Sequence, residues 1–486
     1  MLSVSERART HSSEISFEYN GLRVSYQELL EQVNTLATHL GFRPKTRGDC
    51  LPLSTPNVSF PYAFDAQNNF ETCVLVHALL KAEEKLFPLH PRLTVIERDS
   101  LRTLTHARYL YPSDEGWSVA QTDPKERNLT GQVTSARQDP SPTTPQTTLF
   151  ISTSGSTGTP KIVCLSRRAL EASARANAEH LRMSSQDRWL LSLNLAHIGG
   201  FSILTRCLFT GAAVVLPPTG LSVEDWVRYV DESQITLLSV VPTQLLRFLE
   251  LPKLPPLKHL RAILVGGASC PPSLLETARR RGLPTITTYG LSEAASQVTT
   301  QPLSEVSNLA PRNDSGIAQG DTVLRIVDGV LELRGKTLFN GYFDPEHPNQ
   351  PTLPLSSDGF FSTGDFGALT SDGRFKPLGR RTDRIVTGGE NVDPVEVENA
   401  ILKIAEIAEA AVVGLRDPEW GQIVAVAFVR KDGQLECPTH WLEKRKNELR
   451  QFLAPYKCPK RWCCVRELPR LPSLKVNRSK VVEFFD

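Results

Sequence analysis

The feature that most constrains this chain is a ten-residue loop that follows a short apolar run. The run Leu149–Ile151 has the length and side chains of a buried strand, and Ser152–Lys161 (STSGSTGTPK) follows it. Glycines let such a loop approach a ligand closely, its N–H groups and hydroxyls converge, and Lys161 adds a mobile positive charge. The loop is therefore predicted to hold a chain of phosphates. A P-loop is excluded, because Lys161 lies between Pro160 and Ile162 where that motif needs Gly-Lys-Ser/Thr.

Short apolar runs alternate with helical patterns along most of the chain, which favours an α/β fold. Further buried strands are predicted at residues 213–216, 237–241 and 262–265, with helical segments between them. A helix is predicted to begin after Ser25, which forms a capping box with Glu28. With 486 residues the chain exceeds the size of one hydrophobic core, so at least two domains are expected.

The best domain boundary lies close to Gly379–Asp383, which divides the chain into domains 1–380 and 381–486. Just after it, Asp393 and Pro394 have the spacing of an N-cap and the first residue of a helix. The remaining stretch of about 100 residues is long enough for a small domain with its own core.

Composition narrows the partners that this chain is expected to have. A formal net charge of +2 without long basic runs argues against a nucleic-acid partner. No apolar run approaches the ~20 residues that cross a bilayer, and the polar stretch Met1–Glu14 does not resemble a signal peptide. Nine cysteines without paired spacing fit free thiols in a reducing compartment, so a cytoplasmic location is expected. The composition leaves oligomer formation open.

Further motifs follow the loop and extend over nearly the whole chain. Two of them are Tyr289–Glu293, with an aromatic ring and a carboxylate, and Ser362–Asp365, with two hydroxyls and a carboxylate. Together with Gly266–Ala268, Gly379–Arg380 and the loop 468–478, they resemble the motifs of the acyl-adenylate-forming superfamily, the AMP-dependent synthetases and ligases. This resemblance implies a large N-terminal α/β domain of several subdomains and a small mobile C-terminal α+β domain.

The resemblance assigns roles to individual residues of the nucleotide site. The residues expected to bind ATP are Ser154, Gly155, Ser156, Thr157, Gly158, Lys161, Gly267, Ala268, Tyr289, Gly290, Ser292, Asp365 and Arg380. The residues expected to act in catalysis are Lys475, Glu293 and Thr157, and Glu293 is also the expected Mg²⁺ ligand. Lys475 would offset the charge that builds up as two anions approach each other. Leu474, just before it, stands where the family usually has glycine.

The reaction implied by the resemblance has two steps and uses ATP, Mg²⁺ and coenzyme A. A carboxylate first attacks the α-phosphorus of ATP and releases pyrophosphate, and the thiol of coenzyme A then attacks the acyl-adenylate. Between the steps the C-terminal domain would rotate about a hinge at Thr382 and present Gly388 and Gly389 to the thiol.

The acid is predicted from the segment 195–201 (LAHIGGF), which contains no Asp to hold the amino group of an amino acid. This segment, Pro88–Thr94 and the stretch 388–392 resemble those of o-succinylbenzoate–CoA ligases of menaquinone biosynthesis. An acid of that class has a second carboxylate, which would favour a nearby cation.

Three residues are predicted to contact the acid: His197, Gly200 and Arg206. In a helix, Arg206 would share a face with Ser202 and could lie on the side of His197. A solvated Arg206 is the alternative.

Two other functions remain open at this point. One is a ligase for another aryl or medium-chain acid. The other is a non-catalytic nucleotide-binding homologue, suggested by Leu474 and by the segment Val58–Cys73, which fits the family poorly.

Overall fold

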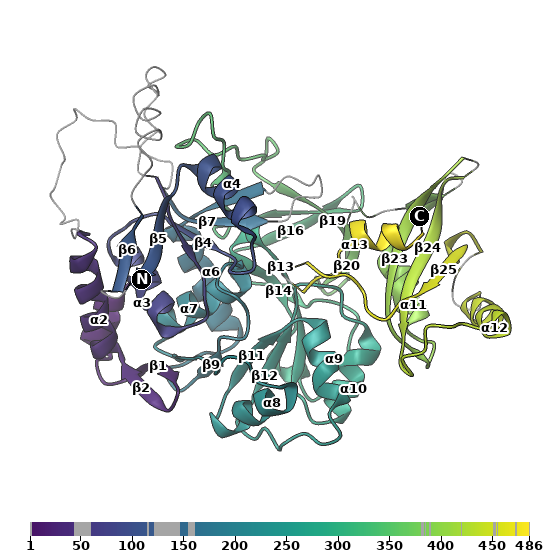
Figure 1. Cartoon of the computed structure of the whole chain (residues 1–486), viewed down its shortest axis with the longest axis horizontal. Helices are drawn as coiled ribbons and strands as arrows, with labels where there is room; N and C mark the ends of the chain where they lie inside the picture. Colours follow the sequence, from purple (N-terminus) through teal and green to yellow (C-terminus); the bar gives the residue numbers. More distant parts are fainter. Residues whose placement is uncertain are drawn as a thin grey trace.

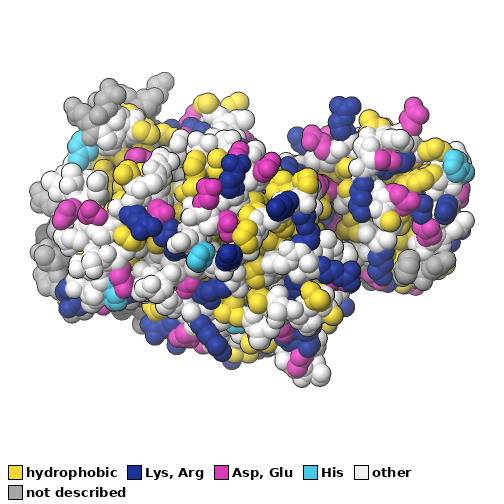
Figure 2. Space-filling model, turned by 90° about the horizontal axis from the view of Figure 1, so that it is seen from below, with side chains coloured by type: hydrophobic (Ala, Val, Ile, Leu, Met, Phe, Trp, Pro, Cys, Tyr) yellow, Lys and Arg dark blue, Asp and Glu magenta, His cyan; other side chains and the backbone are white. Residues whose placement is uncertain are grey.

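Within the residues that the computed structural model describes, the chain forms four β-sheets with helices packed against them (Figure 1). The described residues are 2–42, 60–113, 116–120, 146–153, 161–380, 383, 385–387, 390–418, 420–450, 453, 455–471 and 474–485. None of the helices in these ranges is both long and apolar enough to span a bilayer. Basic and acidic side chains are interspersed on the face shown in Figure 2.

The largest sheet has nine strands and a parallel centre. In spatial order, the strands are β15 (Ile317–Ala318), β14 (Ser296–Thr300), β13 (Thr285–Leu291), β12 (Ala262–Val265), β11 (Leu237–Val240), β9 (Arg188–Leu190), β10 (Ala213–Val215), β1 (Ile15–Tyr19) and β2 (Leu22–Ser25). Strands β9, β11, β12 and β13 run parallel, so their carboxyl ends meet at one edge of the sheet. The segments that follow these strands include three of the predicted motifs, which the topology therefore brings together.

The second sheet has seven strands and carries the two ends of the phosphate loop. In spatial order, they are β18 (Gly341–Tyr342), β8 (Lys161–Ser166), β7 (Thr147–Thr153), β4 (Leu86–Leu89), β3 (Tyr62–Asp65), β5 (Arg108–Ser113) and β6 (Gly116–Val119). β7 and β8 are antiparallel neighbours. β3 comes from the segment that fits the family poorly, yet it pairs with β4 and β5 inside the sheet.

One large core holds the two sheets together. The helices between them are α3 (Phe70–Lys81), α6 (Arg167–His180) and α7 (Ile198–Thr210), with α1 (Val4–Thr10) and α2 (Tyr26–His39) beside α3. Their buried side chains form a single cluster with Ile151 and Val163 of the smaller sheet and Phe17 and Ile286 of the larger one. The outer faces are covered by α8 (Val223–Glu232), α9 (Pro242–Glu250) and α10 (Pro272–Arg280) on the nine-stranded sheet and by α4 (Val95–Thr105) on the seven-stranded sheet.

Two further sheets complete the chain. The four-stranded antiparallel sheet contains, in order, β16 (Val323–Val327), β17 (Val330–Arg334), β19 (Phe361–Leu369) and β20 (Phe375–Arg380). The five-stranded sheet contains β22 (Glu390–Val392), β21 (Ile385–Thr387), β24 (Gly421–Arg430) and β23 (Ile407–Asp417), with β25 (Arg461–Cys464) also paired to β24. The helices α11 (Pro394–Ile401) and α12 (Thr439–Leu449) cover one face of this sheet and α13 (Arg478–Val482) the other.

The five-stranded sheet has cores of its own, because the buried side chains on both of its faces come from residue 385 onward. The expected boundary between residues 380 and 381 stays a prediction, and β20 ends at Arg380 while β21 begins at Ile385. The yellow segment that precedes α13 leads from this part of the molecule back towards β13 and β14 (Figure 1).

Several local predictions are confirmed. Ser25 and Glu28 form the predicted capping box, and Asp393 caps the helix that begins at Pro394. The three predicted strands appear as β10, β11 and β12.

Candidate nucleotide and acid site

Strands β7 and β8 contain the two ends of the predicted phosphate loop. Thr153 lies opposite Lys161 in the register, and its hydroxyl donates a hydrogen bond to the Lys161 carbonyl at 3.2 Å. Strand β7 extends two residues beyond the predicted apolar run, through Thr153. The predicted ligands Ser154, Gly155, Ser156, Thr157 and Gly158 lie outside the described residues, as does Gly389.

Lys161 and Glu293 lie on either side of Tyr342, which the sequence did not single out. The Lys161 ammonium is 5.0 Å from the centre of the Tyr342 ring, and the Tyr342 hydroxyl donates to Glu293 Oε1 at 2.8 Å. Pairing of β18 with β8 sets this contact, because it places Tyr342 opposite Val163. The lysine predicted to bind phosphate and the predicted metal ligand thus both contact Tyr342.

Tyr289 and Asp365 meet directly, although they belong to different sheets. The Tyr289 hydroxyl donates to Asp365 Oδ2 at 2.7 Å. The Tyr289 ring packs edge-on against Phe375, with 4.8 Å between ring centres. Arg380 is opposite Asp365 in the β19–β20 register, but its side chain lies outside the described part of the chain. The structure therefore brings together an aromatic ring, a carboxylate and the Arg380 backbone, which belong to three residues that the resemblance assigns to ATP binding.

The segment from Gly290 to Ser296 is tightly folded. A Cβ at Gly290 would lie 2.1 Å from the Ser296 carbonyl oxygen, so only glycine fits there. Ser292 begins a short 3-10 turn, η1 (Ser292–Ala294), and Ala295 and Ser296 after it both have positive φ, 52° and 103°. Such backbone strain outside glycine is concentrated at functional sites in proteins.

Lys475 lies against the turn that follows β12. Gly267 in this turn has φ +80°, and a Cβ added to it would lie 4.0 Å from Lys475 Cε. Gly267 and Ala268 are both exposed. The structure thus brings the predicted catalytic lysine to Gly267, which is predicted to bind ATP and is more than 200 residues away in the sequence.

His197 lies at the N-terminus of α7, beside a second histidine. It occupies the N-cap position without capping through its side chain, and its ring centre is 5.3 Å from that of His90. Burial, together with the charges of His90 and Lys475, lowers the pKa of His197 to about 4. Nδ1 of His90 accepts a hydrogen bond from the Arg92 backbone N–H at 3.1 Å, and burial also lowers the pKa of His90. Both rings are therefore neutral near pH 7, and Nε2 of His197 is buried without a hydrogen-bond partner within the described residues.

Gly200 is placed in the first turn of α7, where the chain packs on itself. A Cβ there would lie 2.3 Å from the Asn194 carbonyl oxygen and 2.5 Å from that of Leu193. Close packing is a sufficient reason for this glycine, and its contact with an acid stays a prediction.

Arg206 is buried rather than solvated, so the solvated alternative is wrong. It is 2% exposed, and its guanidinium lies 5.4 Å from the centre of the Trp189 ring. Nη2 donates to the Ser296 hydroxyl at 3.1 Å. The Ser202 oxygen lies 3.3 Å from the same hydroxyl and 3.0 Å from the Gly199 carbonyl, so its one proton is shared between these two acceptors. Burial lowers the pKa of Arg206 to about 9, so it remains a cation at neutral pH. Among the described residues it forms no ion pair with a carboxylate, and its Nε has no partner.

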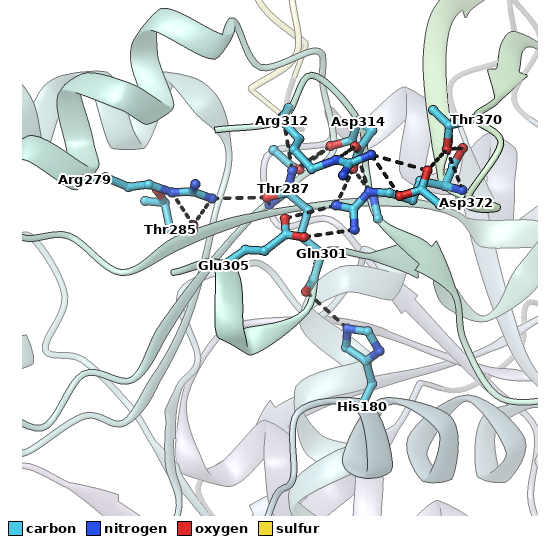
Figure 3. A network of polar contacts seen from close by, with 12 residues as sticks. His180, Arg279, Thr285, Thr287, Gln301, Glu305, Arg312, Asp314, Thr370 and Asp372 are labelled. Carbon is cyan, nitrogen blue, oxygen red and sulfur yellow. Dashed lines mark hydrogen bonds and ion pairs between the residues drawn. The ribbon is translucent and has the colours of Figure 1, made fainter. Parts of the chain in front are cut away.

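A polar network joins the nine-stranded sheet to the β19–β20 hairpin (Figure 3). Its centre is Asp314, whose carboxylate accepts hydrogen bonds from Arg374 Nε at 2.8 Å and from Arg312 Nε at 3.0 Å. Arg374 is 5% exposed and also pairs with Glu305 at 2.9 Å, in the short turn η2 (Leu303–Glu305). Burial alone would raise the pKa of Asp314, but these hydrogen bonds hold it below its usual value.

The same network reaches back to β13. The Thr287 hydroxyl donates to the Asp314 carbonyl at 2.7 Å, and Gln301 Nε2 donates to that carbonyl at 2.9 Å. Arg279 donates in turn to Gln301 Oε1 at 3.2 Å (Figure 3). The network therefore fixes the strand that carries Tyr289 relative to the hairpin that carries Asp365.

The residues present fit a magnesium ion held mainly by its nucleotide. Mg²⁺ is usually bound in proteins through one or two carboxylates together with substrate phosphates and water. Glu293 supplies one carboxylate beside the phosphate loop. The described residues contain no group of three or more His, Cys, Asp or Glu side chains that could form a complete protein site for a metal.

The sequence alone missed Tyr342, Phe375, Asp314 and Ser296. Each acts through a partner that is distant along the chain, such as Glu293 for Tyr342. A local motif carries no signal for such contacts.

Comparison with known proteins matches residues 4–343 to the AMP-binding enzyme family and residues 396–475 to the AMP-binding enzyme C-terminal domain. A 2-succinylbenzoate–CoA ligase from Bacillus cereus is 30% identical over 499 residues, covering 98% of this chain and 96% of that protein. An o-succinylbenzoate coenzyme A synthetase from Bacillus subtilis, solved with the acyl-adenylate intermediate OSB-AMP, has a TM-score of 0.78 at 28% identity and covers 98% of this chain and 97% of its own. A structure of that synthetase with ATP and magnesium has a TM-score of 0.78 at 27% identity, covering 98% of both chains.

These matches confirm the expected architecture of a large N-terminal α/β domain followed by a C-terminal domain. The family match spans more than half of the residues, and the Bacillus cereus relative aligns along nearly all of them. The chain belongs to the AMP-binding enzyme family.

Proposed function

We propose that this chain is an ATP-dependent acid–CoA ligase that converts 2-succinylbenzoate into its CoA thioester through an acyl-adenylate, with release of AMP and pyrophosphate. The observation that supports the proposal is the position of Lys475, which lies beside Gly267 and near enough to His197 to lower its pKa. One side chain therefore lies near a residue predicted to bind the nucleotide and near a residue predicted to bind the acid.

In the adenylation step, Lys475 would stabilise the charge that builds up between the acid carboxylate and the α-phosphate. His197 is neutral at pH 7, because its pKa is about 4, so it adds no second positive charge beside the lysine. Its Nε2 has no hydrogen-bond partner among the described residues and is suited to a hydrogen bond with the acid.

The nucleoside would be held by the ring of Tyr289 and the carboxylate of Asp365, which already contact each other. Lys161 and Glu293 would hold the phosphates and their metal. Bound Mg²⁺ supplies positive charge that offsets the charge of the phosphates.

The thioester step requires room for the thiol of coenzyme A. We infer that Lys475 withdraws with the C-terminal part of the chain and that Gly388 and Gly389 then line the path of the thiol.

The proposed location is the cytoplasm, which fits the eight described cysteines, because all are free. The partners in this proposal are ATP, coenzyme A and the acid.

The second carboxylate of 2-succinylbenzoate would be recognised by Arg206 through Ser296. The Ser296 oxygen accepts a hydrogen bond from Arg206, so its own proton can be donated to a ligand. A buried guanidinium without a carboxylate partner among the described residues favours an anion nearby.

The test is an acid panel with Mg-ATP and coenzyme A, in which pyrophosphate and CoA thioester are measured for 2-succinylbenzoate, benzoate and octanoate. We expect 2-succinylbenzoate to give the highest kcat/KM. Ser296→Ala should lower that value about 10- to 100-fold, as expected for losing a hydrogen bond to a charged group, while leaving benzoate turnover unchanged.

Other outcomes of the panel separate the alternatives. Turnover of benzoate or octanoate without turnover of 2-succinylbenzoate would leave a ligase for a different acid. Absence of pyrophosphate release with every acid would leave a nucleotide-binding homologue without catalysis.

A further inference from the structure

The loop that carries Lys475 is closed by backbone contacts at its base. Arg470 and Val476 face each other in an isolated antiparallel bridge. Within the loop, the Leu471 N–H donates to the Lys475 carbonyl at 2.8 Å and the Leu474 N–H donates to the Leu471 carbonyl at 2.9 Å. The direction in which the Lys475 side chain points therefore depends on the backbone conformation of Leu474.

Leu474 is held in a conformation that leucine rarely adopts. Its φ is +66°, in the left-handed region that glycine enters freely and a residue with a Cβ atom does not. An additional contact is needed to keep such a residue in place, because extended or right-handed conformations are preferred for leucine.

Arg470 provides that contact. Its Nη1 donates to the Leu474 carbonyl oxygen at 3.1 Å, so the guanidinium fixes the peptide unit that joins Leu474 to Lys475. Its Nη2 donates to the Glu409 carboxylate on β23. The two side chains are 19% and 28% exposed, so the pair is partly shielded from solvent. Glu409 thus anchors the guanidinium to the five-stranded sheet.

We propose that Arg470, anchored by Glu409, is a positioning residue for Lys475: it holds Leu474 in the left-handed conformation and so directs the lysine towards Gly267. The inference rests on the proposed ligase function. It also explains how this chain tolerates leucine at a position that a glycine would occupy without strain.

The proposal predicts that dependence on Arg470 comes from Leu474. The two half-reactions are measured separately, adenylation as acid-dependent ATP–pyrophosphate exchange and thioester formation as the reaction of coenzyme A with acyl-adenylate prepared beforehand. Arg470→Met is expected to lower kcat of exchange about 10- to 100-fold, as for a small misplacement of a catalytic group, with KM for ATP and the thioester rate unchanged. Arg470→Lys should recover part of the loss, and Glu409→Gln should reproduce it more weakly.

The decisive variant is the double substitution Arg470→Met with Leu474→Gly. Glycine adopts the left-handed conformation without help, so the double variant should exchange within about threefold of Leu474→Gly alone. Lys475→Ala gives the floor of exchange. Arg445→Met is the matched control, because Arg445 pairs with Glu406 and Glu448 on the opposite face of the same sheet and should leave both half-reactions unchanged.

The proposal would be overturned if Arg470→Met caused the same loss of exchange in the unmodified protein and in the Leu474→Gly variant. Equal losses in both half-reactions would overturn it as well. If Arg470→Met fails to fold, Glu409→Gln provides the same comparison. A failure of the proposed function can be told apart from a failure of this proposal, because the unmodified protein would then give no exchange with any acid.

Discussion

His197 is the N-cap of α7 and Arg206 lies about two and a half turns further along the helix; each has one buried nitrogen without a partner in the described chain. A buried donor or acceptor that lacks a hydrogen bond destabilises a protein, and a bound ligand removes that cost by supplying the missing partner. Helical spacing correctly placed Ser202 and Arg206 on one face, where both reach Ser296. Nothing in the sequence indicated that Ser296 would be the common acceptor, because it comes from a strand about 90 residues later.

The buried state of His197 predicts a loss of stability in acid. Its pKa is about 4 in the folded chain and 6.5 when unperturbed, so the unfolded chain binds more protons between these values. The contribution of His197 to the free energy of unfolding is therefore fully present above pH 6.5. It falls as the pH drops towards 4, by at most about 1.4 kcal/mol per pH unit. His197→Gln should lose less stability than the unmodified protein between pH 6.5 and 4, as measured by thermal unfolding. His259→Gln, at an exposed position, is the control, and equal acid sensitivity of His197→Gln and the unmodified protein would contradict the assignment.

At the scale of elements, capping and turn residues were predictable because they act within a few residues of the chain. Ser25 with Glu28 and Asp393 with Pro394 specify where two helices begin. Strand β18 was not predictable: it is two residues long, and its pairing with β8 joins segments about 180 residues apart. That pairing places Tyr342 between Lys161 and Glu293.

The first turn of α7 should tolerate a methyl group at Gly199 but not at Gly200. At Gly200 the added Cβ would meet a backbone oxygen at 2.3 Å, whereas at Gly199 it would meet the flexible Cδ1 of Leu193 at 3.2 Å. We expect Gly200→Ala to lower the free energy of unfolding by about 1–3 kcal/mol, the usual cost of overpacking, and Gly199→Ala to cost less. Urea unfolding of both variants gives the comparison. Equal effects would show that backbone proximity does not decide this position.

At the scale of the whole molecule, the proposed nucleotide site contains residues from two sheets that meet there. Tyr289 comes from the nine-stranded sheet and Asp365 from the four-stranded one, and their hydrogen bond depends on how the sheets meet. Asp314 and Arg374 lie in the network that joins them (Figure 3). A buried ion pair of this kind is costly to break, because removing one partner leaves the other charge uncompensated.

Arg374→Met is therefore expected to raise KM for ATP more than it changes KM for the acid. The loss of alignment between Tyr289 and Asp365 should raise KM for ATP by about tenfold, and Arg374→Lys should recover part of it. Arg325→Met is the matched control, since Arg325 pairs with Glu332 and Asp358 in the same four-stranded sheet away from the joint. The prediction is checked by steady-state kinetics with each substrate varied in turn, and it fails if both arginine variants change the three KM values alike.

The class of fold and the kind of chemistry could be predicted from the amino-acid sequence. The loop Ser152–Lys161, the helix starts and the order of the motifs are local properties, since glycine content, caps and short apolar runs act over a few residues. Three contacts became visible only in the folded chain: Lys475 lies beside Gly267, Tyr289 donates a hydrogen bond to Asp365, and Arg206 is buried against Ser296. These contacts join residues far apart in the chain, and they exist because parallel strands end at a common edge and a buried network fixes one sheet against another.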